Sequence, residues 1–424
     1  MADEILIAPR VMTGEQTVTD GAVVVGQRVV EWVGPEAALP AQYAARPRTD
    51  YPGATILPGL IDSHVHLGFD GGPDPVGRMR AETDAQQLVL MLRSARELLG
   101  VGVTTARDLG ARAYLDVVVR DAIAEGLAPG PRMMVANRPV TVTGGHCWFM
   151  GGEADSEDDL RRIVRTHHKH GADLIKVMAT GGFMTGGSAP WYAQFSAEQL
   201  AIVVAEARRL DKPVAAHAHG VEGIRRAVEA GVTTIEHCSF VTETNERHFD
   251  ERLAAQIAER GIFVCPTVNV NAPYVAELTG RAVGENVMKM RDAGVRIIAG
   301  TDAGINNNPH HQYAGGLQAL VSLLGFKPAE VIAMATTEAA AALGLGAVTG
   351  RLAPGYDADL IVVDGDPVAD IAALSRLRRV IARGREYVPD SGRFDVSAPG
   401  TPYADPDARV NLRRLADAAR QRRG

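Results

Sequence analysis

The chain has few cysteines, no long apolar run and no excess of basic residues, and each shortage excludes a class of protein. Its three cysteines, Cys147, Cys238 and Cys265, are too few and too scattered for a disulfide framework or a zinc ribbon. No apolar run is as long as a membrane-spanning helix. The chain does not open with a basic segment followed by an apolar stretch, so we expect no secretory signal and a location in the reducing cytoplasm.

Charge and size narrow the class further. The 44 basic residues are outnumbered by 51 acidic ones, and the net charge of −7 argues against a nucleic-acid binder, which would show a basic face. A hydrophobic fraction of 46% and a charged fraction of 22% are ordinary for a globular protein. The 424 residues leave room for one large domain and a smaller one. We expect a small-molecule substrate as partner, with no nucleic acid and no membrane.

The two ends of the chain share one pattern. Residues 1–58 contain short β-branched runs that are separated by Gly and Asp, without a helical period. Similar runs return at 350–390. We therefore expect a small β-sandwich domain that is built from both chain ends. Residues 391–424 are rich in Pro, Asp, Arg and Ala, and we expect a C-terminal arm that ends in a helix.

The middle of the chain, residues 59–349, alternates apolar strand-like runs with helical stretches. The expected strands end in the segments 62–66, 104–108, 133–137, 174–178, 214–217, 234–237, 263–267 and 297–302. The helical patterns between them include 84–99, 156–170, 196–210 and 221–230. Ser196 precedes Gln199 at capping-box spacing, and Ser156 precedes an acidic first turn. About eight consecutive β/α units predict an α/β protein with a (β/α)8 TIM barrel.

Two histidines that are separated by a single residue lie at the end of the first of these strands. His64 and His66 are two positions apart, and such residues point to the same side of a strand. Both imidazoles can therefore reach one metal ion. The pair alone is equally compatible with two ordinary polar residues at a strand end.

Further polar residues lie in or at the end of other expected strands. Functional residues of a (β/α)8 barrel lie at the carboxyl ends of its strands, and apolar neighbours make an unpartnered polar group costly to bury. A set spread over several strands near the same rim predicts a metal site, which adds Lys176, His217, His237 and Asp302 to the histidine pair. For Lys176 alone, an ordinary pairing with an acidic side chain is the alternative.

These residues lie in runs that resemble the amidohydrolase superfamily over nearly the whole chain. The supporting runs are PGLIDSHVH at 58–66, VAAHAHG at 214–220, IEH at 235–237, GTDAG at 300–304 and GRLAPGYDADL at 350–360. Within the superfamily the chain is most similar to the imidazolonepropionase-like and prolidase-like branch. That branch includes dipeptidases, carboxypeptidases and hydrolases of amide- or carbamate-type xenobiotics.

The resemblance implies a binuclear metal centre and assigns its ligands. His64, His66 and Asp302 would hold one divalent ion, and His217 and His237 the other. Lys176, made neutral by apolar surroundings, would carry a CO2-derived carbamate that bridges the two ions. A metal-bridging hydroxide would be the nucleophile, and Asp302 would move its proton. Zinc is the expected metal, and manganese or cobalt also suits these ligands.

For several other residues the sequence supports a functional role less directly. His146 follows the third expected strand and either polarises the substrate carbonyl or is bonded locally within its loop. Tyr192, in the glycine-rich loop 181–195, is a candidate donor to a substrate oxygen. His219 is expected beside the metal centre or at the surface, and Arg138 is a weak candidate for a substrate carboxylate. Two larger sets complete the candidates: the segment 306–311, and the loop aromatics Trp148, Phe149, Phe183 and Trp191, which indicate an apolar substrate portion or merely pack at the rim.

The leading hypothesis is a metal-dependent hydrolase that cleaves a C–N bond of an amide, a peptide (a dipeptide or an N-acyl amino acid) or a carbamate. The alternative is a mononuclear deaminase or cyclic-amide hydrolase of the same fold. Deaminases of this type typically lack the strand-four lysine and carry a glutamate after the strand-five histidine, whereas this chain has Lys176 and the run His217-Ala218-His219-Gly220. A non-catalytic binding protein is the third hypothesis. We also expect a homo-oligomer.

Overall fold

The computed structural model describes residues 3–244, 246–279 and 284–388. The strands are β1 (Glu4–Met12), β2 (Thr17–Val25), β3 (Val30–Pro35), β4 (Arg48–Asp50), β5 (Ala54–Pro58), β6 (Leu60–Val65), β7 (Val103–Asp108), β8 (Arg132–Val135), β9 (Ile175–Met178), β10 (Val214–Gly220), β11 (Thr234–Val241), β12 (Phe263–Cys265), β13 (Leu360–Asp364), β14 (Leu377–Ala382) and β15 (Arg385–Tyr387). The predicted arm at 391–424 lies outside the described residues.

Helices occupy most of the remaining middle of the chain. They are α1 (Pro75–Ala81), α2 (Asp84–Gly100), α3 (Leu115–Glu125), α4 (Glu157–Lys169), α5 (Ala197–Arg209), α6 (Val221–Ala230), α7 (Glu251–Glu259), α8 (Ala272–Thr279), α9 (Glu285–Asp292), α10 (Tyr313–Ser322), α11 (Pro328–Met334) and α12 (Thr337–Ala342). Both expected caps form. Ser156 and Ser196 each accept a hydrogen bond from the third helical residue in a capping box, which stabilises a helix by about 1 kcal/mol.

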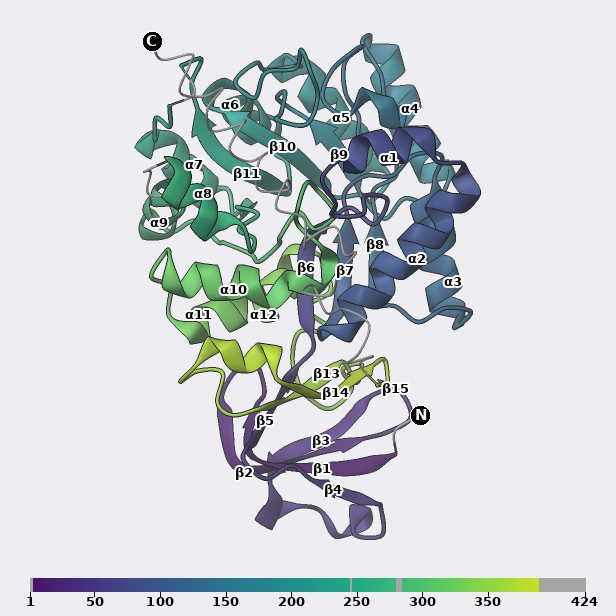
Figure 1. Cartoon of the computed structure of the whole chain (residues 1–424), viewed down its shortest axis with the longest axis vertical. Coiled ribbons are helices and arrows are strands. Elements are labelled where there is room, and N and C mark those ends of the chain that lie inside the picture. The colour runs from purple at the N-terminus through teal and green to yellow at the C-terminus, as the bar shows by residue number, and fades with distance from the viewer. Residues whose placement is uncertain (1–2, 245, 280–283, 389–424) are drawn as a thin grey trace.

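One sheet joins the two ends of the chain. Its strand order is β15-β14-β13-β5-β1-β2-β3, with β4 paired to β1. Most neighbours are antiparallel, and β13 pairs along β5 from Leu360 opposite Pro58 to Asp364 opposite Ala54. Figure 1 shows this sheet at one end of the molecule, with the helical part at the other. The structure thus pairs strands that are about 300 residues apart, while the division into domains stays a prediction.

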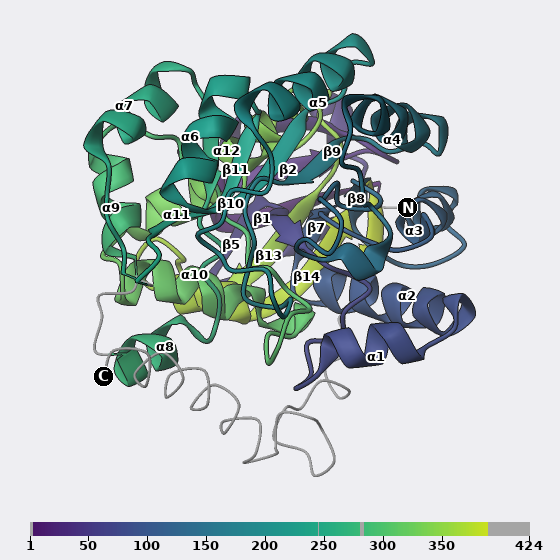
Figure 2. The same ribbon diagram turned by 90° about the horizontal axis from the view of Figure 1, so that it is seen from above.

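The middle of the chain forms two parallel sheets, β6-β7-β8 and β12-β11-β10-β9. Their strands are almost entirely buried, which explains the near-continuous apolar runs in the sequence. Figure 2 shows helices such as α3 to α7 outside these strands. The mixed α/β content agrees with the predicted class. Single bridges, from Val140 to Val177 and from Val65 to Ala303, join the two sheets to neighbouring segments, and closure of a barrel stays a prediction.

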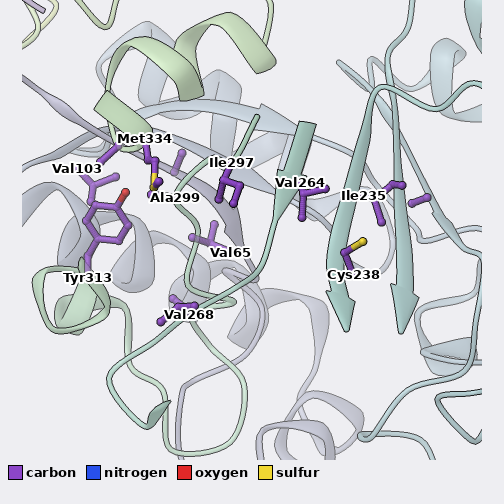
Figure 3. Close-up of a cluster of buried hydrophobic side chains, with 14 of the residues drawn as sticks. Val65, Val103, Ile235, Cys238, Val264, Val268, Ile297, Ala299, Tyr313 and Met334 are labelled. Carbon is purple, nitrogen blue, oxygen red and sulfur yellow. The ribbon is translucent and has the colours of Figure 1, made fainter. Parts of the chain in front are cut away.

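The eighth predicted strand, at 297–302, is wrong as a regular strand. This segment makes only isolated bridges, from Ile297 to Val264 and from Ala303 to Val65. Its backbone leaves the strand ladder because the Thr301 N–H donates to the Asp62 carboxylate and Asp302 adopts a positive φ of 58°. The segment is nevertheless well packed, and Figure 3 shows Ile297 and Ala299 in one buried apolar cluster with neighbouring side chains.

No helix among the described residues combines the length and the apolar character that crossing a membrane requires.

Candidate metal centre

The first ligand group forms where β6 ends. His64 is the fifth residue of β6 and His66 follows the strand, so both rings turn to one side, with centroids 5.3 Å apart. Asp302 arrives from the distorted segment after β12, and its N–H donates to the His64 carbonyl at 2.8 Å. Its Oδ1 lies 3.4 Å from His64 Nε2 and 3.2 Å from His66 Nε2. All three side chains are buried and close enough to share one ion.

The second group comes from two adjacent parallel strands. His217 and His219 are two positions apart on β10, so their side chains point to the same side of the strand. His237 follows Glu236 on β11 and has a positive φ of 68°. The ring of His237 lies 4.6 Å from that of His217 and 4.4 Å from that of His219. It also lies 5.2 Å from the ring of His64, which brings the two groups into one cluster.

His219, which was expected either beside the metal centre or at the surface, lies within the second group. The structure gathers it with His217 and His237 in one potential ligand set. Its Nδ1 contacts the Ser239 hydroxyl at 3.0 Å, whereas His217 Nε2 contacts the Gly181 carbonyl at 3.0 Å. His219 is therefore as well placed to hold an ion as His217.

Lys176 gives the most direct test of whether a cation fits. It lies on β9, is 1% exposed, and its Nζ has no hydrogen-bond partner among the described residues. Burial lowers the pKa of its amine, against the opposing effect of Glu236 and Asp302. An unpartnered buried amine is costly. Asp302 Oδ1, which faces Nε2 of His64 and of His66, likewise has no hydrogen-bond partner among the described residues. Together with the donor set, this fits a pair of divalent cations.

Burial favours the neutral form of His64, His217, His219 and His237, which is the form in which imidazole binds a metal. Burial lowers the pKa of His64 to about 4 and that of His219 to about 3. Burial also holds the pKa of His217 and of His237 well below the usual 6.5. Burial alone would raise the pKa of Asp302, but His64, His66 and Lys176 outweigh it and lower this pKa.

Two charged residues of the strands, Glu236 on β11 and Arg107 on β7, belong to the site although no role was expected for either. The His64 ring is neutral, so Nδ1–H donates to Glu236 Oε2 at 2.9 Å and leaves Nε2 to face Asp302. Arg107 donates to Glu236 Oε1 at 2.8 Å and to the Ser63 carbonyl at 2.7 Å. This buried pair fixes the orientation of His64, as carboxylates do for metal-bound histidines. Charged residues inside apolar strands were the signal that could have found it.

We expect Glu236→Gln to weaken metal binding about 10- to 100-fold, because one amide oxygen cannot serve both Arg107 and His64 in place of two carboxylate oxygens. Glu236→Ala should also destabilise the metal-free protein by about 3–5 kcal/mol, since it leaves the Arg107 guanidinium buried without a counter-charge. Chelator competition and urea unfolding measure the two effects. Glu338→Gln, which breaks an exposed pair with Arg296, is the matched control. Metal affinity at the original level in Glu236→Gln would refute this role.

His146 lies beside the second group. Its ring is 4.5 Å from that of His217, and its buried Nδ1 has no hydrogen-bond partner among the residues the structure describes. Burial lowers its pKa to about 3. Gly182 packs so closely over this ring that any side chain there would collide with it. The position suits a substrate contact, and that role stays a prediction.

The remaining candidate residues do not form one group around the metal centre. Tyr192 is 59% exposed and packs edge-on against Trp191, so its role as a donor stays a prediction. Arg138 stacks over the Tyr114 ring instead of joining the histidines. In the segment 306–311, His310 Nε2 donates to the His66 carbonyl at 3.2 Å and so supports the first group from behind.

Comparisons with known proteins identify the relatives of this chain. The model of the amidohydrolase family matches residues 55–386. An ochratoxinase of Aspergillus niger is 30% identical over 403 residues, covering 85% of this chain and 81% of the relative. An imidazolonepropionase of Ruegeria sp. (strain TM1040) is 28% identical over 391 residues, covering 84% and 89%. A solved Xaa-Pro dipeptidase with methionine bound in its active site superposes with a TM-score of 0.81 at 28% identity, over 91% of this chain and 99% of that one.

Proposed function

Because the chain belongs to the amidohydrolase family, we propose that it hydrolyses a C–N bond of an amide, a peptide or a carbamate with the help of two divalent cations. Family membership and the named relatives already make it a hydrolase of C–N bonds. The observation that carries the finer proposal is that the two histidine groups lie side by side, within electrostatic reach of one buried lysine amine that has no hydrogen-bond partner among the described residues.

The proposed holders of the cations are His64, His66 and Asp302 on one side and His217, His237 and Lys176 on the other. His219 is a further candidate on the second side. When bound, two zinc, manganese or cobalt ions would polarise the substrate carbonyl and supply a nucleophilic water near neutral pH. Burial lowers the pKa of the Lys176 amine, which favours the neutral form that can add CO2; the addition releases a proton and leaves an anionic carbamate with two oxygens.

The protein groups around this centre have separate tasks in the proposal. Asp302 is ionised and faces both histidines of the first group, so it can accept a proton from water and return it to the leaving nitrogen. His146 is neutral and can donate a hydrogen bond to the substrate carbonyl. Glu236 and Arg107 keep the His64 ring in one orientation.

The rim of the site supports a substrate with an apolar portion. Phe183 is 59% exposed, and its ring lies 4.9 Å from that of His219. Trp148 is 38% exposed on the loop after β8. Dipeptides and N-acyl amino acids with apolar side chains are therefore the first substrates to test, followed by aryl carbamates. A cyclic-amide substrate is the second candidate, favoured by the similarity to imidazolonepropionases.

The proposal includes the architecture that holds the site. The two parallel sheets and the segment 297–303 would close into a (β/α)8 barrel over residues 59–349. The parallel pairings within the sheets support this closure, as do the single bridges from the sheets to the segments beside them. Residues 1–58 and 350–390 would form the accompanying β-sandwich domain, which the shared sheet supports.

Removal of metal tests the function directly. We expect a chelator to abolish hydrolysis of the substrate that a screen identifies, and added zinc, manganese or cobalt to restore it. Metal analysis of the active enzyme should give about two ions per chain. A value near one would favour the mononuclear alternative. Full activity in metal-free protein would refute the proposal.

A further inference from the structure

A second site of concentrated charge lies away from the histidines. It is a cavity of about 240 Å³, and five of its seven lining residues are arginines: Arg28, Arg120, Arg132, Arg383 and Arg385. We call it the arginine pocket. The metal centre lies toward the carboxyl ends of the parallel strands, whereas Arg132 is the first residue of β8 and pairs beside the start of β7. The two sites are therefore at opposite ends of these strands.

The pocket is built where the helical part meets the large sheet. Arg120 lies on α3, and Arg132 opens β8. Arg28 comes from the turn between β2 and β3, and Arg383 and Arg385 come from the hairpin of β14 and β15. Figure 1 shows α3 and β8 above this hairpin. The arginines thus reach the cavity from three directions.

The arginines are only partly neutralised. Arg132 pairs with Asp357 and Asp359, both at 2.8 Å, and Arg120 pairs with Asp173 at 2.9 Å. Arg132 Nε, however, is buried without a hydrogen-bond partner in the described part of the chain. The ion pairs of Arg132 hold its side chain in place but leave this N–H donor unused.

The two arginines of the hairpin, Arg383 and Arg385, form no ion pair with a carboxylate in the described part of the chain. Arg383 donates from Nη2 to the Gly130 carbonyl at 3.4 Å, and among the described residues Arg385 makes no side-chain hydrogen bond or ion pair. Burial, followed by the positive charges of Arg132, Arg385 and Arg28, lowers the pKa of Arg383, against the effect of Asp359. Arg120 and Arg132 are paired with carboxylates, but Arg383 and Arg385 add positive charge beside them for which no ion pair is formed among the described residues, and this surplus favours an anion in the pocket.

We propose that the arginine pocket binds a phosphate group, either as inorganic phosphate or as part of a small phosphomonoester. Guanidinium forks match the oxygens of phosphate and carboxylate. One guanidinium can occupy both oxygens of a carboxylate. A tetrahedral phosphate dianion, in contrast, accepts hydrogen bonds from several directions, and the arginines of this pocket approach from several directions. The volume far exceeds the roughly 30 Å³ of one water and falls short of the roughly 300–1,000 Å³ of sites for larger ligands. The proposal does not depend on the proposed hydrolytic function.

Calorimetric titration of inorganic phosphate at constant ionic strength tests the site. Phosphate could also bind at a metal centre, so the titration is made with both the metal-loaded and the chelator-treated protein. We expect one phosphate to bind per chain in both forms. The double variant Arg28→Gln/Arg385→Gln should weaken this binding at least tenfold, because both rim donors are lost. Both residues are exposed, and Arg28 keeps only a 3.7 Å contact with Asp357, so the variant should fold.

The controls separate the pocket from general charge effects. Arg252→Gln removes one exposed guanidinium on α7 and should leave phosphate binding unchanged. Glycerol phosphate binding as tightly as inorganic phosphate, or more tightly, would identify a phosphomonoester site, and the reverse would identify a site for free phosphate. Binding that disappears with the metal, binding that survives the double variant, or tighter binding of succinate than of phosphate would each overturn the proposal. If the double variant does not fold, Arg385→Gln alone makes the same test.

Discussion

Asp302→Asn is expected to lower kcat about 10²- to 10⁴-fold while the protein stays folded. The amide keeps the size of the carboxylate but cannot accept a proton at neutral pH, and proton transfer contributes a factor of this order. In the structure the carboxylate lies within 3.4 Å of His64 Nε2 and His66 Nε2, and its ionised form is favoured by His64, His66 and Lys176. Steady-state kinetics on the identified substrate, with the metal content measured in parallel, give the result.

The control must separate catalysis from metal loss and from folding. Asp364→Asn changes an exposed carboxylate at the end of β13 and should keep normal kinetics. If Asp302→Asn binds metal normally and loses activity, the carboxylate acts on the proton. If it loses metal and activity together, its main role is that of a ligand. An Asp302→Asn enzyme with the original kcat would exclude both roles.

Lys176→Met is expected to abolish activity and to remove at least one of the two proposed ions. The amine is the only feature of this side chain that can add CO2, and methionine fills a similar volume without it. Because the buried Nζ has no hydrogen-bond partner among the described residues, its replacement should not destabilise the metal-free protein and could even stabilise it. Metal analysis and thermal unfolding with and without chelator measure both effects.

Lys169→Met, on the exposed end of α4, is the matched control and should bind metal normally. Lys176→Met with full metal content and full rate would refute the bridging role. A large loss of stability in the metal-free form would show instead that Lys176 has a structural partner that the present geometry does not provide.

Much of the fold could be predicted because its elements have local signals. The strands at β6 to β12 are short apolar runs, and helices such as α4 and α5 carry capping boxes, so each element is specified by its own residues. The segment 297–302 is apolar in the same way, but its ladder is interrupted by a hydrogen bond from Thr301 to the side chain of Asp62. Asp62 is about 240 residues away in the chain, so no local pattern could have shown this.

For the site, too, the contribution of the sequence differs from that of the tertiary structure. The sequence by itself determined which chemical groups are available, because the side chains of His64, His66, His217, His237 and Asp302 carry atoms that can bind a metal wherever they lie. Only the tertiary structure decided which side chains meet. It placed His219 against His237 of the neighbouring strand, left Tyr192 at the surface, and joined Glu236 to both His64 and Arg107. Residue type is a property of the chain, whereas the distance between two side chains depends on how whole elements pack, and that is fixed only in the folded molecule.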